Sequence, residues 1–211
     1  RREGKSDLAI HYVGHVMVDN VLYHAEKLSG LSTEFETADF KRRHARYGVV
    51  TLHRPSNVDD AAMMARIGGA LKEIAAELPL LFPVHPRTRA NLDKFGIDLG
   101  PNVTLVGPQP YMAFLNVWKD AAVVLTDSGG LQEETTALGV PCITIRENTE
   151  RPVTVDEGTN VLAGTDPARI VAEVRKVLTG QGKQGRRPQL WDGKAAERIV
   201  EILASELGSQ S

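Results

Sequence analysis

The sequence predicts an α/β fold, a Rossmann-like, doubly wound parallel sheet. From residue 47 onward, short apolar runs typical of buried parallel strands alternate with segments of helical periodicity. The loops between them are short, and glycine or proline stands at several junctions. This alternation is typical of a parallel sheet with helices on both faces.

The predicted strands and helices follow one another along most of the chain. The strands are Tyr47–Leu52, Leu80–Val84, Val103–Val106, Ala122–Thr126, Pro141–Ile145 and Asn160–Leu162. The helices are Asp59–Glu77, Arg87–Phe95, Tyr111–Lys119, Leu131–Leu138, Pro167–Leu178 and Lys194–Leu207. The first of these helices carries an apolar stripe at helical spacing, which is predicted to pack in the core. The stripe consists of Met63, Ile67, Leu71, Ile74 and Leu78.

The first 45 residues do not follow this alternation. Ala9–Val13 is predicted to be a short strand and Val16–Leu28 a helix, whereas Ser29–Arg46 is polar and charged. Near the other end, Gln181–Pro188 is rich in Gly, Lys, Arg and Gln and is predicted to be a mobile surface loop.

Composition excludes several classes of protein. The 211 residues are 42% hydrophobic and 25% charged, which is ordinary for a globular protein, and the formal net charge of −2 argues against a broad nucleic-acid-binding surface. One cysteine, Cys142, excludes an intramolecular disulfide, and its apolar neighbours predict a buried structural thiol. No apolar run approaches the about 18 residues of a membrane-spanning helix, and no signal peptide opens the chain. We therefore expect no membrane association and a cytoplasmic location.

The stretch LTDSGGLQEE, residues 125–134, joins a predicted strand to a predicted helix through Ser128, Gly129 and Gly130. Two interpretations are open. Unhindered N–H groups at a helix N-terminus favour an anion such as phosphate. Alternatively, the Asp or Ser of this step could simply cap the helix.

The ends of the neighbouring strands carry further polar residues. His53 and Arg54 follow the first strand, and His85 and Arg87 follow the second. A guanidinium suits phosphate or carboxylate, and a histidine can donate, accept or carry a proton. The alternative for each pair is a satisfied loop histidine beside a solvated arginine. The two histidines lack the short spacing of a metal site, so no metal is predicted.

The remaining strand ends complete the pattern. Phe114, on the helix after the third strand, could form a wall for a flat ring or pack in the core. Glu133 and Glu134 follow the glycine step and could accept ribose hydroxyls or favour the helix dipole. The fifth strand is followed by a charged loop that ends in Arg151. Ligands bind beyond the carboxyl ends of such strands, so the set predicts a nucleotide diphosphate site.

Four stretches together resemble the non-hydrolysing UDP-N-acetylglucosamine 2-epimerase family. They are VTLHRPSN, FPVHPRTR, LTDSGGLQEETTALGVPCITIRENTERPVTVDEGTN and WDGKAAERIVEIL, and IHYVGHVMVDN near the start extends the resemblance almost end to end. The resemblance implies one half of a GT-B-type two-domain fold. Residues 1–45 would be the tail of an N-terminal domain and the interdomain crossing, 46–180 a Rossmann-like UDP-binding domain, and 181–211 a loop and C-terminal helix.

The resemblance also implies roles for individual residues. His53 matches the family's catalytic-cleft histidine, whereas its acidic catalytic residues would lie in the part absent from this chain. Arg54 matches the neighbour of that histidine in the family's HR motif and would bind the substrate, His85 matches the HP loop near the nucleotide, and Phe114 matches an aromatic beside the uracil. The remaining matches are Ser128, Gly129 and Gly130 to the diphosphate turn, Glu134 to the ribose-binding glutamate, and Arg151 to an arginine that meets the phosphates.

The implied reaction eliminates UDP from UDP-N-acetylglucosamine and adds it back with C-2 inverted, giving UDP-N-acetylmannosamine. It implies no metal or redox cofactor, UDP and a UDP-N-acetylhexosamine as ligands, and a homodimer for the complete protein. HRPSN and TERPV depart from the family's HRREN and TERPE, which leaves the sugar and any regulation by substrate open. A GT-B glycosyltransferase and a non-catalytic nucleotide-binding module are the alternatives.

Overall fold

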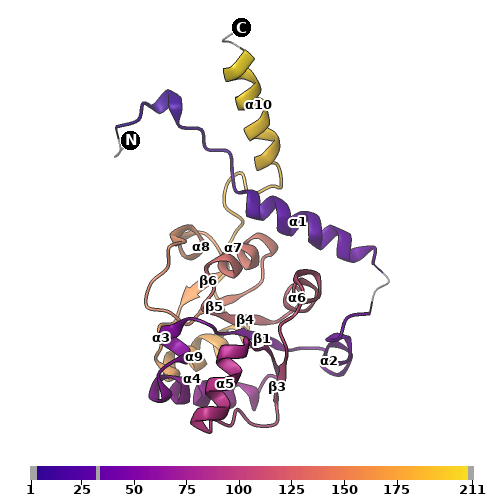
Figure 1. The fold of residues 1–211 in the computed structure, drawn as a ribbon, viewed down its shortest axis with the longest axis vertical. Coiled ribbons are helices and arrows are strands. Elements are labelled where there is room, and N and C mark those ends of the chain that lie inside the picture. Colours follow the sequence, from indigo (N-terminus) through magenta and orange to yellow (C-terminus); the bar gives the residue numbers. More distant parts are fainter. Residues whose placement is uncertain (1–3, 32–33, 209–211) are drawn as a thin grey trace.

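The computed structural model describes residues 4–31 and 34–208 and contains one six-stranded sheet in these residues. Its strands are β1 (Gly48–Thr51), β2 (Leu80–Pro83), β3 (Val103–Val106), β4 (Val123–Thr126), β5 (Cys142–Thr144) and β6 (Asn160–Leu162). All neighbouring pairs are parallel, in the order β3-β2-β1-β4-β5-β6 (Figure 1). This is the order of the Rossmann fold, so the predicted doubly wound sheet is confirmed.

The helices also follow the predicted pattern, and the predicted ones lie within a few residues of their expected bounds. They are α1 (Val16–Ser29), α2 (Ala38–Arg43), α3 (Pro55–Val58), α4 (Ala61–Ala75), α5 (Pro86–Phe95), α6 (Tyr111–Trp118), α7 (Gly129–Leu138), α8 (Pro152–Asp156), α9 (Pro167–Leu178) and α10 (Ala195–Gly208). Proline at the first position of α3, α5, α8 and α9 supplies the φ angle that a helix start needs.

Two apolar clusters fix the layers of the domain. One packs α4, α5 and α9 against one face of the sheet, and the other packs α1, α6 and α7 against the opposite face. Successive side chains of β4 point to opposite faces of the sheet, so Leu125 belongs to the first cluster and Val124 to the second. Each such side chain contributes roughly 1.5–3 kcal/mol when fully buried. The predicted burial of Cys142 is confirmed, and burial raises the pKa of its thiol to about 11.

One predicted strand is wrong, and three short helices were not predicted. Ala9–Val13 is not a strand, because Asp7–Ala9 forms a short 3-10 helix and the chain then continues without regular structure. The helices α2, α3 and α8 were not predicted, since segments of four to six residues are too short to show helical periodicity. Residues 1–3, 32–33 and 209–211, parts of the segments predicted at the two ends, lie outside the described residues.

The segment Gln181–Pro188, predicted to be mobile, is instead fastened to the domain. Lys183 donates to the carbonyl of Asn160 at 3.1 Å, and the Arg186 amide donates to the Glu157 carbonyl at 2.8 Å. Arg187 Nε donates to the Ala137 carbonyl at 2.9 Å. The Lys183 and Arg187 side chains and the Arg186 amide thus donate to backbone carbonyls of other parts of the chain, a pairing that composition does not reveal.

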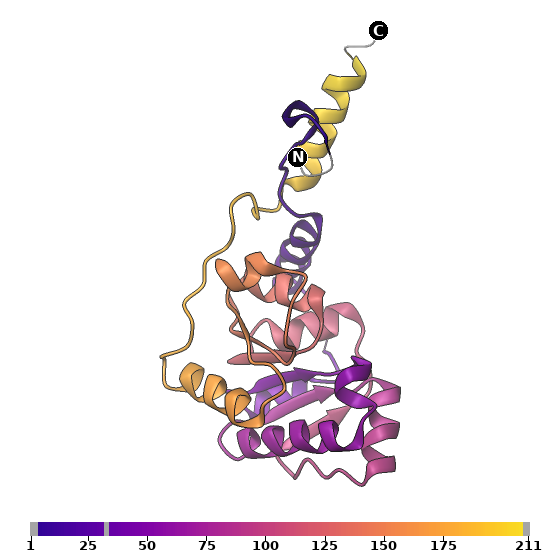
Figure 2. The same ribbon diagram turned by 90° about the vertical axis from the view of Figure 1, so that its left-hand side faces the viewer.

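The segment leads from α9 along one side of the domain to α10, which projects beyond the sheet together with the N-terminal residues (Figure 2). Val200, Leu203 and Leu207 of α10 are largely exposed. In the part of the chain that the structure covers, no helix has the length and apolar character needed to cross a membrane.

Gly158, between α8 and β6, allows a close approach that a side chain would block. A Cβ there would lie 2.4 Å from Thr136 Oγ1 and 2.6 Å from the Thr154 carbonyl oxygen. Gly158→Ala should lower the free energy of unfolding by about 1–3 kcal/mol, as overpacking does. In urea denaturation, Gly69→Ala in α4, where a Cβ meets nothing within 4 Å, should instead raise it by about 0.5–1 kcal/mol. Equal effects at both glycines would contradict the packing argument.

Candidate functional site

A cavity of about 460 Å³ opens at the carboxyl edge of the sheet, where β1 and β4 lie side by side. Its walls come from the residues that follow β1, β2, β3 and β4, and α1 adds Met17. A crevice at this point is where doubly wound sheets bind ligands. Of the residues predicted to form the site, His53, His85, Phe114, Ser128, Gly130 and Glu134 line the cavity, whereas Arg54, Gly129 and Arg151 do not.

The glycine step forms the first turn of α7. Ser128 is the N-cap residue, but its side chain makes no capping hydrogen bond. The first amides of a helix have no partner within it, so those of α7 are available to an anion. A Cβ on Gly130 would meet nothing within 4 Å, and one on Gly129 only Glu150 Oε2, at 4.0 Å. Neither glycine has a positive φ, so the two glycines contribute space here and not an unusual backbone angle.

Behind this turn lies Asp127, a carboxylate that sequence reasoning considered only as a cap. It is fully buried, and its Oδ2 accepts hydrogen bonds from the Arg54 amide at 2.8 Å and from Asn57 Nδ2 at 3.1 Å. Burial would raise the pKa of Asp127, but hydrogen bonds from His53 and Arg54 outweigh it and lower the pKa. Asp127 therefore stays ionised and holds the residues after β1 in place.

His53, the predicted catalytic residue, lies beside this carboxylate. Its Nδ1 is 2.9 Å from Asp127 Oδ1, and its backbone amide donates to Asp127 Oδ2 at 3.0 Å. The hydrogen bond to Asp127 raises the pKa of His53, against the effect of partial burial. The pairing fixes the ring through Nδ1, so Nε2 is the nitrogen left for a ligand in the cavity that His53 lines.

Arg54 follows His53 and is the N-cap residue of α3, without a side-chain capping hydrogen bond. It does not line the cavity. Its Nε is buried and has no hydrogen-bond partner within the described residues. A buried donor of this kind costs free energy unless something accepts from it.

Glu134 faces the cavity from the second turn of α7 and is 8% exposed. Tyr111 Oη donates to its Oε1 at 3.1 Å. Burial raises the pKa of Glu134, an effect that the Tyr111 hydrogen bond opposes and the charge of Glu133 reinforces. Because no acidic residue lies in the first turn of α7, the helix dipole does not explain either glutamate. Sequence reasoning missed Tyr111, which looked only like the start of a helix.

The two ring residues predicted for the site are both in the cavity wall. His85 caps α5, and its Nδ1 accepts from the Arg87 amide at 3.2 Å. Phe114 packs against the apolar cluster on the α7 side of the sheet and also lines the cavity. Phe114 therefore packs in the core, as one of the two alternatives expected, and also forms part of the cavity wall.

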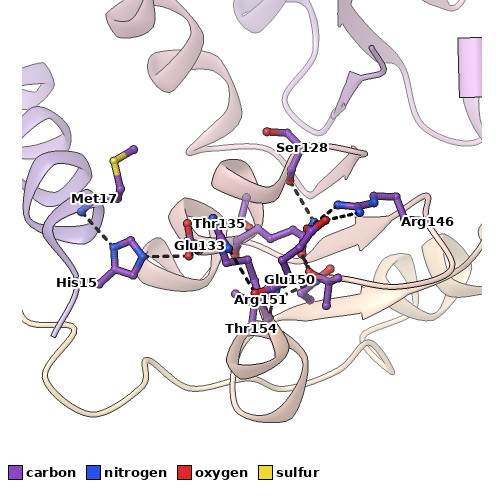
Figure 3. Close-up of polar contacts among 12 residues, drawn as sticks. His15, Met17, Ser128, Glu133, Thr135, Arg146, Glu150, Arg151 and Thr154 are labelled. Carbon is purple, nitrogen blue, oxygen red and sulfur yellow. Dashed lines mark hydrogen bonds and ion pairs between the residues drawn. The ribbon is translucent and has the colours of Figure 1, made fainter. Parts of the chain in front are cut away.

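The arginines after β5 are paired with acids of the same region (Figure 3). Arg151 Nε is 2.6 Å from Oε1 of Glu133, which is 4% exposed. Arg146, which the prediction did not include, pairs with Glu150 at 2.7 Å, and this hydrogen bond lowers the pKa of Glu150 to about 2. The charged loop thus lies beside the first turn of α7, and its two arginines form ion pairs with glutamates of the protein itself.

Over residues 4–31 and 34–208, no group of three or more His, Cys, Asp and Glu side chains is arranged to hold a metal ion.

The His53–Asp127 pair yields a direct test. Asp127→Asn removes the charge that favours the imidazolium, so the pKa of His53 should fall from its raised value toward or below the ordinary one. An NMR titration of the histidine ring protons measures this. Asp120→Asn, which alters a carboxylate paired with Lys41 instead, is the control and should leave His53 unchanged. An unaltered His53 titration in Asp127→Asn would show that the pair does not set this pKa.

The profile of the family described as UDP-N-acetylglucosamine 2-epimerase matches residues 1–204. The enzyme of that name from Methanococcus maripaludis is 36% identical over 97% of this chain and 57% of its own length. The UDP-2,3-diacetamido-2,3-dideoxy-D-glucuronate 2-epimerase of Pseudomonas aeruginosa is 35% identical over 91% of this chain and 52% of its own length.

Among solved structures, the UDP-GlcNAc 2-epimerase of Methanocaldococcus jannaschii in complex with UDP-GlcNAc and UDP matches with a TM-score of 0.82 and 35% identity, over 97% of this chain and 57% of that one. The fold is thus a Rossmann-like half of a GT-B-type fold, as predicted. The chain spans little more than half the length of the relatives it matches. With its profile match, its relatives and its fold in agreement, the chain belongs to the UDP-N-acetylglucosamine 2-epimerase family.

Proposed function

We propose that this chain is the UDP-binding part of a UDP-N-acetylglucosamine 2-epimerase. The diphosphate would lie on Ser128, Gly129 and Gly130 at the first turn of α7, with Arg54 and Arg151 beside it. The ribose would bind to Glu134, and the uracil would lie near Phe114 and His85. The relative from Methanocaldococcus jannaschii, whose solved structure holds UDP-GlcNAc and UDP, supports this choice of ligand.

The observation that carries the proposal is the cavity at the carboxyl edge of β1 and β4. One wall is the first turn of α7, whose glycines leave space and whose amides favour an anion. A further wall holds the Glu134 carboxylate next to the Tyr111 hydroxyl, and such a carboxylate accepts from vicinal hydroxyls. An anion, a ribose and a flat ring therefore each have a matching surface within one cavity.

In the proposed reaction, the C-2 proton is removed and UDP leaves C-1, which gives a glycal. UDP then adds back to C-1 while a proton is delivered to the opposite face of C-2, which yields the 2-epimer. The α7 amides and Arg151 would offset the charge that develops on the departing diphosphate. His53, whose pKa Asp127 raises, would present its Nε2 to the reacting end of the ligand. The acidic groups that move the C-2 proton would come from the part of the family's length that this chain does not span.

The sugar is proposed as a UDP-activated 2-acetamido sugar, with UDP-N-acetylglucosamine as the first candidate. The names of the two relatives differ in the sugar and share UDP and epimerisation at C-2. A homodimer for the complete protein and a cytoplasmic location stay predictions from the resemblance and from the sequence.

The function is tested by comparing the 211-residue chain with a protein extended to the full family length. We expect both to bind UDP, and only the longer one to convert UDP-N-acetylglucosamine to its 2-epimer in an NMR assay without any acceptor. Turnover by the 211-residue chain alone would overturn the proposal that the acidic groups needed for catalysis lie outside this chain. Release of UDP only when an acceptor is added would instead indicate the glycosyltransferase alternative.

Glu134→Gln tests the ribose contact. Loss of charge-assisted hydrogen bonds to two hydroxyls should weaken UDP and uridine equally, by about 1–3 kcal/mol, because both ligands carry the ribose. Isothermal titration measures both affinities. The melting temperature without ligand should hardly fall, since burial already disfavours the charged form of Glu134. Loss of stability without loss of affinity would assign Glu134 to the fold.

Gly129→Val tests the diphosphate turn. A valine side chain would fill the space over the α7 amides, so UDP binding should be lost in isothermal titration. The fold should persist, because a Cβ at this position meets only Glu150, at 4.0 Å. The matched control is Gly69→Val in α4, remote from the cavity and equally open, which should retain UDP binding. Unchanged UDP affinity in Gly129→Val would leave the turn as a plain helix start.

A further inference from the structure

Glu133 is a buried carboxylate to which the proposed ligand contacts give no role. It is 4% exposed and lies on α7 next to Glu134, but it does not line the cavity. Its Oε1 is 2.6 Å from Arg151 Nε and 2.9 Å from His15 Nε2 (Figure 3). A charge buried this deeply is destabilising unless partners compensate it, and here the partners come from two other parts of the chain.

The geometry defines the state of His15. Its Nδ1 accepts a hydrogen bond from the Met17 amide at 3.1 Å, at the start of α1, so this nitrogen carries no proton. The ring proton of a neutral His15 is therefore on Nε2, which donates it to Glu133. The ring also packs edge-on against Trp191, with centroids 5.4 Å apart. His15 thus fixes the Glu133 carboxylate from the side of α1.

Glu133 in turn holds only one edge of the Arg151 guanidinium. The carboxylate forms an ion pair with Nε, the nitrogen nearest the main chain, although the buried Nε–H makes no hydrogen bond within the described residues, and Nη1 donates to the Glu150 carbonyl at 3.3 Å. A guanidinium has five N–H donors in a rigid plane, so an ion pair at this edge restricts where the outer donors lie. The side chain is 43% exposed, so those outer donors are accessible from solvent.

The main chain of Arg151 is fixed by the residue next to Glu133. Gln132 is fully buried, and its Oε1 accepts from Thr149 Oγ1 at 2.6 Å. That hydroxyl accepts in turn from the Arg151 amide at 3.0 Å. Gln132 Nε2 donates to the Ser128 carbonyl at 3.2 Å, which connects the same network to the first turn of α7. Two successive residues of α7 therefore set the position of Arg151 relative to that turn.

We propose that Glu133 is a positioning residue that orients Arg151 toward the diphosphate, and that His15 holds Glu133 in the required place. The proposal rests on the proposed UDP site and adds a residue that does not touch the ligand. The proposal predicts the direction in which UDP affinity changes when Glu133 is neutralised, and a simple competition between Glu133 and the ligand predicts the opposite direction. If Glu133 only competed with the diphosphate for Arg151, its neutralisation would strengthen UDP binding, whereas loss of a positioning contact weakens it.

The test measures UDP and uridine affinities of the 211-residue chain by isothermal titration. Glu133→Gln should weaken UDP on the order of tenfold, the effect of one misaligned charge-assisted hydrogen bond, and should leave uridine within about twofold. In an Arg151→Ala background, which itself lowers UDP affinity, the same change should have no further effect. Glu157→Gln removes a carboxylate paired with Arg186 at 3.2 Å and is the matched control, with UDP affinity unchanged.

Two substitutions of His15 separate its two contacts. His15→Gln can still place an N–H near Glu133, whereas His15→Asn can cap α1 but is too short to reach Glu133. Only His15→Asn should therefore weaken UDP relative to uridine, and this pair also serves if Glu133→Gln fails to fold. Equal UDP affinity in the two His15 variants would overturn the role of His15.

The outcomes distinguish the two levels of the proposal. If the unaltered chain binds neither UDP nor uridine, the proposed function fails. If it binds UDP and Glu133→Gln binds UDP equally well or more tightly, or loses affinity equally in the Arg151→Ala background, only the positioning role of Glu133 is overturned.

Discussion

The buried carboxylate of Asp127 is the contact on which the arrangement of the site depends. β1 and β4 are neighbours in the sheet but distant in sequence, and the chain leads from each of them into a different helix. Asp127, at the end of β4, accepts hydrogen bonds from the His53 and Arg54 amides and from Asn57, all of which come after β1. In a fully buried site these bonds replace the water that the carboxylate loses, and they fix the two strand ends relative to each other.

The same region keeps most of its charges in internal pairs. Arg151 forms an ion pair with Glu133, and Arg146 forms one with Glu150. Both pairs lie beside the first turn of α7, where the glycines have no side chains to fill the space. Breaking such a pair costs free energy, because a partly buried charge is left without its partner. The acids behind the arginines therefore hold the guanidinium groups beside the first turn of α7.

Predictability from sequence differed between elements for physical reasons. The strands were predictable because burial on two faces gives a continuous apolar run. The long helices were predictable because burial along one stripe, as in α4, gives a helical periodicity. Short helices such as α3 and α8 carry too few residues to show one. Strand-end residues such as His53, His85, Ser128 and Glu134 could be grouped because parallel strands bring their carboxyl ends to one edge.

The sequence by itself determined the fold class, the edge of the sheet where the cavity lies and, through its motifs, the family. Only the tertiary structure decided how the polar groups pair. Asp127 bonds residues about 70 positions earlier, and Glu133 reaches a histidine 118 positions away. Such pairing has no local signature, because a buried carboxylate is compensated by whichever donors the fold brings to it, and no periodicity of the chain encodes that choice.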